Sequence, residues 1–427
     1  MNKFPQKSSV GSATERSLPV SEAIAPLTPA AAPQIEEIVQ RRQAHQHPVF
    51  RMDKSLINTP PPLPAVELME GARKSRYSAW ELGPACGLPE LRQEIANWRR
   101  NLYAERITSE NVLITSGASA AFNLTVNALV RPEESVIVMP PCFPNYLGAL
   151  RNRGTHITRV PLQQDNDFEP SLPLLETAWK SGARMAVCTL PNNPTATTLE
   201  NACVNRIEKM AREHGGWVVI DETFSSFDLR PDIQPLKNLS LRSTITLGTF
   251  SEAFSLADLR VGYIIGPKEL VRDIGVLQGV INPSGSARAQ EVACAALRER
   301  EAHFSKLIPA LRSRDADLQD ALTRVPGIES IVGYAGPFKW IKTGATDSAQ
   351  LAVSLARETG ITVRPGIDYG QEGWVRLAFG MIGTPREYAQ ALSLLRSFKG
   401  WEAPRWDENI KLPARPRAAK SGVSAAP

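Results

Sequence analysis

Short runs of apolar residues alternate along the chain with longer stretches in which apolar residues recur at helical spacing. The short runs are rich in valine and isoleucine and predict strands, whereas the longer stretches predict helices. Because most of these strands are apolar throughout and are separated by helices, we expect an α/β fold with a mostly parallel sheet covered on both faces. The predicted strands span residues 112–117, 135–141, 184–190, 217–221, 243–250 and 260–266, and two of the helices span 118–130 and 200–216.

A smaller α+β region is expected after the sheet. Residues 50–85 are expected to return to this region, which places the start of the chain beside its end. Its predicted elements are a long helical stretch at 286–322, strand patterns at 336–344, 361–366 and 374–380, and a helix at 347–359.

The two ends of the chain differ from its middle in composition. They are rich in small residues and proline and lack periodic apolar positions, which is typical of flexible tails. The expected organisation is a flexible tail at 1–45, an N-terminal segment of the small domain at 46–85, a large domain at 86–285, a long helix with the small C-terminal domain at 286–412, and a flexible tail at 413–427.

Composition and charge exclude several classes of function. A chain of 427 residues with 42% hydrophobic and 22% charged residues can bury a large core and is typical of a soluble globular protein. The net charge of +5 is small for this length and no block of like charges occurs, so neither nucleic acid nor a membrane surface is an expected partner. No run of 18 apolar residues is present, so we expect no transmembrane helix.

The N-terminus and the cysteines indicate the compartment. No uninterrupted apolar segment follows the first basic residues, so we expect no secretory signal. The 5 cysteines are scattered, without a C-x-x-C pair or a nearby histidine cluster. This indicates reduced thiols in a cytoplasmic protein, and neither a disulfide framework nor a metal site.

Candidate chemistry lies at the ends of the predicted strands, where ligands of open α/β sheets bind. Residues 115–120 (TSGASA) join a strand to a helix, and their free N–H groups and the Ser119 hydroxyl could cradle an anion. The same residue types also begin ordinary helices. Phe143, in the stretch PPCFPNY, could stack on a planar ring, although core packing is the commoner role of such an aromatic.

Polar residues follow two more predicted strands. Asn192 and Asn193 precede Pro194, a pattern that suits a turn as well as a binding site. Asp221 ends the apolar run 217–221. A carboxylate at a buried strand end is costly unless a cation pairs with it, so Asp221 is the sharper signal of a binding site.

Two arginines stand out in the second half of the chain. The stretch GTFSEAFSLADLRVG (248–262) supplies Thr249, Ser251 and Arg260. These three residues could surround a phosphate, whose geometry suits the planar fork of arginine. Arg376 is a lone charge inside the apolar pattern WVRLAFG, where it is expected to bind an anion or a buried carboxylate.

In this order and spacing, the motifs resemble those of class I and II aminotransferases of pyridoxal phosphate fold type I. The resemblance extends to the histidinol-phosphate aminotransferase and threonine-phosphate decarboxylase relatives. It spans roughly residues 50–400 and includes RYSAWELGPACGLPELRQEIANW, which contains Tyr77. It implies a mostly parallel seven-stranded sheet in a large cofactor-binding domain, and a smaller α+β domain. It also implies an amino acid or keto acid as substrate, and a homodimer in which Tyr77 reaches the phosphate of the neighbouring subunit.

The resemblance assigns roles to single residues. Phe143 matches the aromatic that stacks on the cofactor's pyridine ring, and Asn193 matches the amide that bonds its 3′-oxygen and also faces the substrate. Asp221 matches the carboxylate that pairs with the ring nitrogen and so makes the ring an electron sink. Arg376 matches the arginine that binds the α-carboxylate of the substrate. The positions that match phosphate ligands are Gly117, Ala118, Ser119, Thr249, Ser251 and Arg260.

The pattern breaks at its most important position. Glu252 stands where the family has the lysine that forms a covalent Schiff base with the cofactor and moves the proton during the reaction. A carboxylate has no amine, so a covalent link through this residue is chemically excluded. No other lysine lies within ten residues on either side of Glu252.

Further departures surround Glu252. Phe224, still expected to line the cofactor site, stands where the family usually has a tyrosine that donates to the 3′-oxygen. Ser255, Asp258 and Ala196 stand where glycines are usual. One engineered change would not account for several departures, so natural divergence is the expected origin.

Three functions agree with this mixture of retained and lost residues. In the first, the protein binds pyridoxal or pyridoxamine phosphate without a covalent link, and Glu252 acts as general acid or base; a pKa lowered by the phosphate cup would make it a weak base unless burial raises it. In the second, it catalyses a new, cofactor-independent reaction. In the third, it is a non-catalytic binding or partner protein. The first is favoured because a pseudoenzyme has no need of buried charges at both Asp221 and Arg376.

Overall fold

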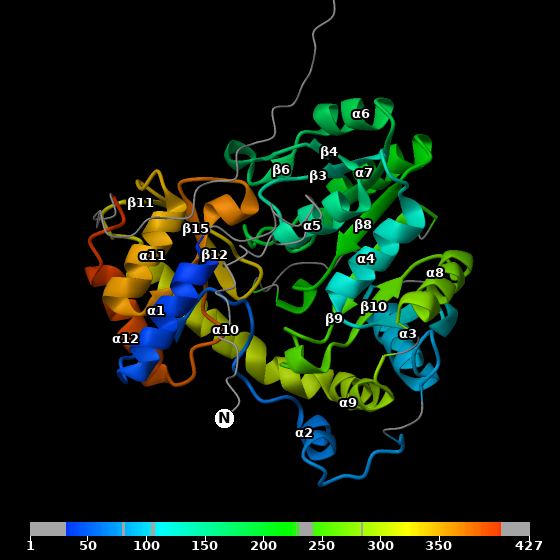
Figure 1. Ribbon diagram of the computed structural model, residues 1–427, viewed down its shortest axis with the longest axis horizontal. Coiled ribbons are helices and arrows are strands. Elements are labelled where there is room, and N and C mark those ends of the chain that lie inside the picture. Colours follow the sequence, from blue (N-terminus) through cyan, green and yellow to red (C-terminus); the bar gives the residue numbers. More distant parts are fainter. Residues whose placement is uncertain are drawn as a thin grey trace, which may run out of the picture.

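The computed structural model describes residues 31–78, 82–103, 107–227, 229, 242–282 and 285–402. Within these residues the chain forms two main sheets, one of seven strands and one of four. Helices α9 (Ala287–Arg298) and α10 (Arg300–Leu322) run from the part of the molecule with the large sheet to the part with the small one (Figure 1).

The large sheet has the strand order β2-β10-β9-β8-β7-β3-β4. Strands β9, β8, β7, β3 and β4 pair in parallel, and β10 runs antiparallel to β2 and to β9. This arrangement confirms the predicted α/β class with a mostly parallel seven-stranded sheet. The strands are β2 (Val112–Thr115), β3 (Ser135–Val138), β4 (His156–Arg159), β7 (Ala183–Thr189), β8 (Trp217–Asp221), β9 (Thr244–Thr249) and β10 (Gly262–Ile265).

Strand β4 has no counterpart among the strands expected from the apolar pattern. It lies at the edge of the sheet, where it pairs only with β3. Its residues are exposed or half-buried, and His156 and Arg159 are polar. An edge strand needs no continuous apolar run, so the pattern that revealed the inner strands was missing here.

Successive residues of the inner strands enter different cores, because side chains alternate across a sheet. Val136 and Val138 of β3 pack in a core that includes Val126 and Leu150, whereas Ile137 between them packs in a second core with Ile207. The sheet is therefore covered on both faces. The helices on the first face are α4 (Ala118–Leu129), α5 (Pro144–Arg153) and α8 (Lys268–Ile281), and those on the second are α6 (Leu172–Lys180) and α7 (Asn201–Glu213).

The small sheet is antiparallel, with the order β11-β12-β15-β14. Arg376 of β15 lies opposite Trp340 of β12 and Arg364 of β14. The strands are β11 (Ile328–Val332), β12 (Phe338–Thr343), β14 (Arg364–Pro365) and β15 (Trp374–Ala378), and the neighbouring helices are α11 (Ser348–Thr359) and α12 (Pro385–Ser397).

The N-terminal part of the described chain reaches the small sheet's side of the molecule. Strand β1 (Phe50–Arg51) pairs in parallel with β13 (Ile361–Thr362). Before it, helix α1 (Ala32–Ala44) lies alongside α11 and buries Ile35 and Val39 (Figure 1). This part of the expected N-terminal tail therefore forms a packed helix, whereas residues 1–30 and the expected tail at 413–427 lie outside the described residues.

The remaining elements are short or connect the two parts. Helix α2 (Leu63–Met69) contacts α9, and helix α3 (Pro89–Tyr103) contacts α9 and β2. Every helix of the described chain is too short or too polar to cross a bilayer. The other elements are β5 (Leu162–Gln163), β6 (Glu169–Pro170) and the 3₁₀ turns η2 (Ser109–Asn111), η3 (Gln164–Asn166), η4 (Ser225–Phe227), η5 (Ala257–Leu259) and η6 (Gly366–Tyr369).

Candidate active site

A cavity of about 320 Å³ lies at the carboxyl ends of the parallel strands of the large sheet. Thr189, Asp221 and Thr249, which end β7, β8 and β9, all line it. The structure therefore gathers ten of the residues singled out in the sequence around one hollow. They are Ala118, Ser119, Phe143, Asn193, Asp221, Phe224, Thr249, Ser251, Glu252 and Arg260.

One side of this cavity is built to hold an anion. Gly117 caps α4 with a φ of 86°, and a Cβ at this position would lie 2.4 Å from Nη2 of Arg260. Arg260 donates from Nη1 to Oγ of Ser251 at 3.3 Å, and the Thr249 hydroxyl donates to the same oxygen at 2.9 Å. The guanidinium, the hydroxyls and the N-terminus of α4 thus converge, and helix N-termini favour negative charge.

Asp221 is buried and oriented by two donors. The Tyr146 hydroxyl donates to Oδ2 at 2.6 Å, and the backbone N–H of Thr223 donates to Oδ1 at 2.9 Å. The Tyr146 oxygen also lies 3.0 Å from Oγ1 of Thr189. Burial and the neighbouring charge of Asp221 raise the pKa of Tyr146 well above its usual value, so the phenol keeps its proton and donates.

Two aromatic side chains form apolar walls. Phe143 precedes the first turn of α5, and its ring meets that of Tyr146 edge-on with the centroids 5.6 Å apart. Phe224 meets Phe338 edge-on at 5.0 Å. Phe224 has no hydroxyl, so this wall offers packing where a tyrosine would offer a hydrogen bond.

Glu252 shares the cavity with Asp221. Its Oε2 atom is shielded from water and has no hydrogen-bond partner in the described part of the chain. Burial, followed by the negative charge of Asp221, raises the pKa of Glu252 to about 7, although Arg260 and Arg376 oppose the shift. The sequence left open whether the anion cup lowers the pKa of Glu252 or burial raises it. In the structure the effect of burial is the larger, so Glu252 can hold or release a proton near neutral pH.

Arg376 is buried beside the cavity and points to a second one. Its Nη1 donates to Oδ1 of Asn193 at 2.9 Å, and its Nη2 donates to the carbonyl oxygen of Asp53 at 2.6 Å. Its Nε has no partner, and no described carboxylate forms an ion pair with it. Burial lowers the pKa of Arg376, as expected for a charge that lacks a counter-ion.

The hollow next to Arg376 measures about 360 Å³ and is closed on one side by α1. Ion pairs tie α1 to this wall: Arg51 reaches Glu36 of α1 at 3.1 Å and Asp53 at 2.8 Å. Burial opposes ionisation of Asp53, but hydrogen bonds from Arg51 and Thr362 outweigh it and lower the pKa of Asp53. The guanidinium of Arg376, which forms no ion pair with a described carboxylate, thus lies beside a wall that the sequence did not reveal.

Two predicted residues, Gly117 and Tyr77, line neither of these cavities; Gly117 adjoins the anion cup as the cap of α4, whereas Tyr77 forms other contacts. Its hydroxyl donates to Glu90 at 3.3 Å, and it lines neither the 320 Å³ nor the 360 Å³ hollow. The role implied for it belongs to the site of a neighbouring subunit, so its position away from the cavities of one chain does not bear on that role.

Two departures noted in the sequence occupy unusual backbone conformations. Ala196 has a φ of 53° and Ser255 a φ of 56°, in the left-handed region that favours glycine. Both stand where the resemblance leads us to expect glycine. At both positions the backbone therefore adopts a conformation that favours glycine, although the residues are alanine and serine.

The sequence also missed several residues that support the site. Tyr146 lies in helix α5, three residues after Phe143, and only its hydroxyl signals a polar role. Arg99 and Glu222 form a fully buried ion pair directly beside Asp221, with side-chain exposures of 0% and 1%. A charged residue on the apolar face of a helix was the available signal for Arg99.

The residues present fit a planar, phosphorylated pyridine. An anion cup, a buried carboxylate and an aromatic wall surround a hollow that Glu252 also lines. Among the described residues, no group of three histidines, cysteines or carboxylates could hold a metal ion.

Comparison with known proteins agrees with this arrangement. The family model of aminotransferase class I and II matches residues 60–395. The chain is 28% identical over 301 residues to an LL-diaminopimelate aminotransferase of Oleidesulfovibrio alaskensis, which covers 68% of this chain and 77% of that protein. It is 25% identical to an aspartate aminotransferase of Pyrococcus horikoshii, over 73% of this chain and 82% of the relative.

Solved structures show the same fold. The crystal structure of an aspartate aminotransferase from Thermotoga maritima superposes with a TM-score of 0.80, at 21% identity, over 88% of this chain and 99% of that one. An aminotransferase from Mycobacterium tuberculosis also gives a TM-score of 0.80, at 22% identity, over 89% and 99% of the two chains.

Proposed function

Because this chain belongs to the class I and II aminotransferase family, we propose that it binds pyridoxal or pyridoxamine phosphate without a covalent link. We further propose that it acts on an amino acid or keto acid, with Glu252 as acid or base in place of the family's lysine. The observation that carries this proposal is the position of Glu252, which lines the same hollow as the anion cup and Asp221. Its buried Oε2 has no hydrogen-bond partner among the described residues.

Each part of the hollow has a distinct task in this proposal. Ser119, Ser251 and Arg260 bind the phosphate, and Asp221, held by Tyr146, faces the ring nitrogen. When bound, the cofactor supplies an electron sink for charge that develops at the substrate's α-carbon.

In this proposal a buried positive charge binds the substrate. Arg376 binds the α-carboxylate, since it is the buried cation without an ion pair to a described carboxylate. Its Nη1 and Nη2 each make one hydrogen bond and its buried Nε has no partner among the described residues, and a carboxylate fits the planar fork of arginine. Asn193 uses Oδ1 to accept from Arg376, which leaves its amide N–H₂ free to donate into the cofactor hollow.

Glu252 is suited to move a proton. With a pKa of about 7, both its acid and its carboxylate forms are populated near neutral pH, which is the condition for efficient general acid–base catalysis. Because Glu252 lines the hollow and its Oε2 is buried without a hydrogen-bond partner among the described residues, no described group competes for a proton held on that oxygen.

A titration tests the proposal. Purified protein is titrated with pyridoxal phosphate and with pyridoxamine phosphate while the ring absorption is followed, and borohydride is then added. We expect saturable binding without trapping, and loss of binding in Arg260→Gln. Trapping at any lysine would refute the noncovalent link.

Absence of binding by both cofactor forms would leave the other two functions: a new cofactor-independent reaction, or a non-catalytic binding or partner protein. Only the first of these functions converts a substrate, so a screen of amino acids and keto acids for any conversion separates the two. The retained charges of Asp221 and Arg376 favour the cofactor-binding function, because burying them without a ligand is costly.

Two further properties belong to this proposal. The resemblance implies a homodimer in which Tyr77 completes the neighbouring subunit's phosphate site, and the scattered cysteines indicate a cytoplasmic protein. Sedimentation tests the first property, because a stable monomer with full cofactor affinity would contradict it.

A further inference from the structure

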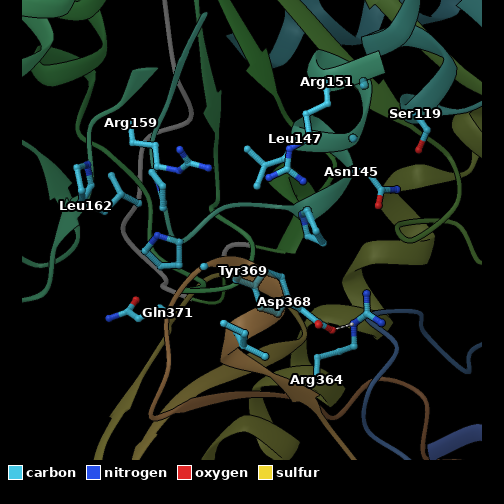
Figure 2. Close-up of a pocket in the computed structure, with 18 of the residues that line it drawn as sticks. Ser119, Asn145, Leu147, Arg151, Arg159, Leu162, Arg364, Asp368, Tyr369 and Gln371 are labelled. Carbon is cyan, nitrogen blue, oxygen red and sulfur yellow. Dashed lines mark ion pairs between the residues drawn. The ribbon is translucent and has the colours of Figure 1, made fainter. Parts of the chain in front are cut away.

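We propose that the substrate carries a second anionic group, which binds in a large cavity beside the cofactor hollow, at Arg151 and Arg159. This inference rests on the proposed function and names the class of substrate. The cavity measures about 920 Å³ and is walled by α5, by the chain after β3 and β4, and by the turn η6 (Figure 2).

The cavity borders both hollows of the proposed active site. Ser119 and Asn145 line both the cavity and the cofactor hollow. Tyr369 and Arg364 line both the cavity and the hollow that contains Arg376. We infer that a molecule whose carboxylate lies on Arg376 extends its other end past these shared residues into the cavity.

The polar groups of the cavity are strongly cationic. Arg151 projects from α5 and Arg159 from β4, and Figure 2 shows both on the same side of the cavity. On the opposite side, Arg364 faces Asp368, with 3.8 Å between Nε and Oδ2. Asp368 is the one carboxylate among the lining residues, so three arginines face a single acid.

Arg151 and Arg159 have no counter-ion on the described part of the chain. Neither takes part in any of its ion pairs, although Asp368 offsets Arg364. Uncompensated cations on the wall of a concave site focus positive potential into it and draw in anions. Two planar guanidinium groups suit a carboxylate, phosphate or sulfonate equally well.

The other walls indicate an extended substrate. Leu147, Leu162 and Ile367 add apolar surface to the proline-rich chain after β3. Ligand pockets are typically apolar with a few placed polar groups, and occupy about 300–1,000 Å³. This cavity lies near the upper end of that range, so it accommodates a long side chain before the terminal anion reaches the arginines. We therefore assign as substrate an amino acid or keto acid whose extended side chain ends in an anionic group.

Unreactive probes test the subsite by itself. Straight-chain dicarboxylic acids of graded length, and phosphono-carboxylic acids, are titrated calorimetrically against monocarboxylic acids of the same lengths. The protein is used with and without saturating pyridoxamine phosphate. We expect the longer two-headed acids to bind more tightly than monoacids of equal length, and the phosphono series shows whether a phosphate-like group is preferred.

The double variant Arg151→Gln/Arg159→Gln should lose about 10- to 100-fold of its affinity for the two-headed acids, because charge-assisted hydrogen bonds are removed. Its affinity for monoacids and for pyridoxamine phosphate should stay unchanged. The matched control Arg131→Gln removes an exposed arginine that lines none of the three cavities described above, and it should bind all probes as the wild type does.

The outcomes separate this inference from the proposed function. Two results would refute the subsite even if the cofactor binds. One is equal affinity for two-headed and single-headed acids, and the other is an affinity of the double variant for two-headed acids equal to that of the wild type. Preference for two-headed acids that depends on the two arginines, without any cofactor binding, would support the subsite and refute the proposed function.

Discussion

Glu252 and Asp221 bring two carboxyl groups into one enclosed hollow, and the charge of Asp221 adds to burial in raising the pKa of Glu252 to about 7. Their surroundings differ. Asp221 accepts hydrogen bonds from Tyr146 and Thr223, whereas Oε2 of Glu252 has no described partner. The two carboxyl groups therefore line one hollow but differ in hydrogen bonding.

The first prediction concerns pH and stability. The pKa of Glu252 is about 7 in the folded chain, above its usual 4.5, so the folded state binds this proton more tightly than the unfolded state. The contribution is fully present below pH 4.5 and is lost as pH rises towards 7. Glu252→Gln has no proton to release, so its free energy of unfolding should not show this loss. Relative to the wild type, the free energy of unfolding of Glu252→Gln should therefore rise by on the order of 2 kcal/mol from acid to alkaline pH.

Urea unfolding of both proteins across this pH range measures the difference. Asp258→Asn removes an exposed carboxylate from the same loop and should keep the wild-type pH dependence. If the free energies of unfolding of the wild type and of Glu252→Gln change in parallel with pH, the pKa of Glu252 is not raised.

The second prediction concerns the missing amine. Glu252→Lys places an amine in the hollow that holds the anion cup and Asp221. With pyridoxal phosphate we expect a coloured, borohydride-reducible covalent complex, and mass spectrometry should locate it at this position. Glu252→Gln is the control and should bind without trapping. A colourless lysine variant would mean that the Phe224, Ser255 and Ala196 departures had already dismantled the site.

The third prediction concerns the hydroxyl on Asp221. Tyr146→Phe removes its 2.6 Å hydrogen bond and leaves a buried carboxylate with one donor fewer. The free energy of unfolding should fall by about 1–3 kcal/mol, and affinity for pyridoxamine phosphate should fall as well. Tyr388→Phe removes another buried tyrosine's hydrogen bond, to the Arg314 carbonyl, and should lower stability without changing cofactor affinity. Equal loss of affinity in both variants would contradict a role for Tyr146 in the site.

The fourth prediction concerns backbone strain. Ser255 has a φ of 56°, so Ser255→Gly should raise the free energy of unfolding by about 1 kcal/mol. Ser305→Gly, in the middle of helix α10, should lower it by about the same amount, because glycine weakens a regular helix. Thermal unfolding of both variants measures the contrast, and destabilisation by Ser255→Gly would show that its hydrogen bond to the Ile57 carbonyl matters more than its backbone.

The sequence revealed the inner strands because burial on both faces demands continuous apolar runs, as in β8 and its terminal Asp221. The edge strand β4 escaped because its exposed positions carry no such pattern. Helix α1 escaped because its few apolar residues, among them Ile35 and Val39, follow a long polar and proline-rich stretch.

For the candidate site, residue types at strand ends were enough to indicate which side chains meet, but their protonation depended on burial. The sequence left two directions open for the pKa of Glu252, because the anion cup and desolvation act in opposite senses. The sequence also did not show which residues far apart in the chain contact each other in the site. Arg376 contacts Asp53 across 323 positions, and no local pattern records such a contact.

Helix α1 has a practical consequence for anyone who shortens this chain. Its Ile35 and Glu36 close the hollow beside Arg376, and Arg51 ties the helix to Asp53, whose carbonyl oxygen accepts from that arginine. A version that begins at the first strand would lack Ile35 and Glu36, and so would lose one wall of this hollow. It would also leave Arg51 without its Glu36 partner and open the side of Arg376 to water.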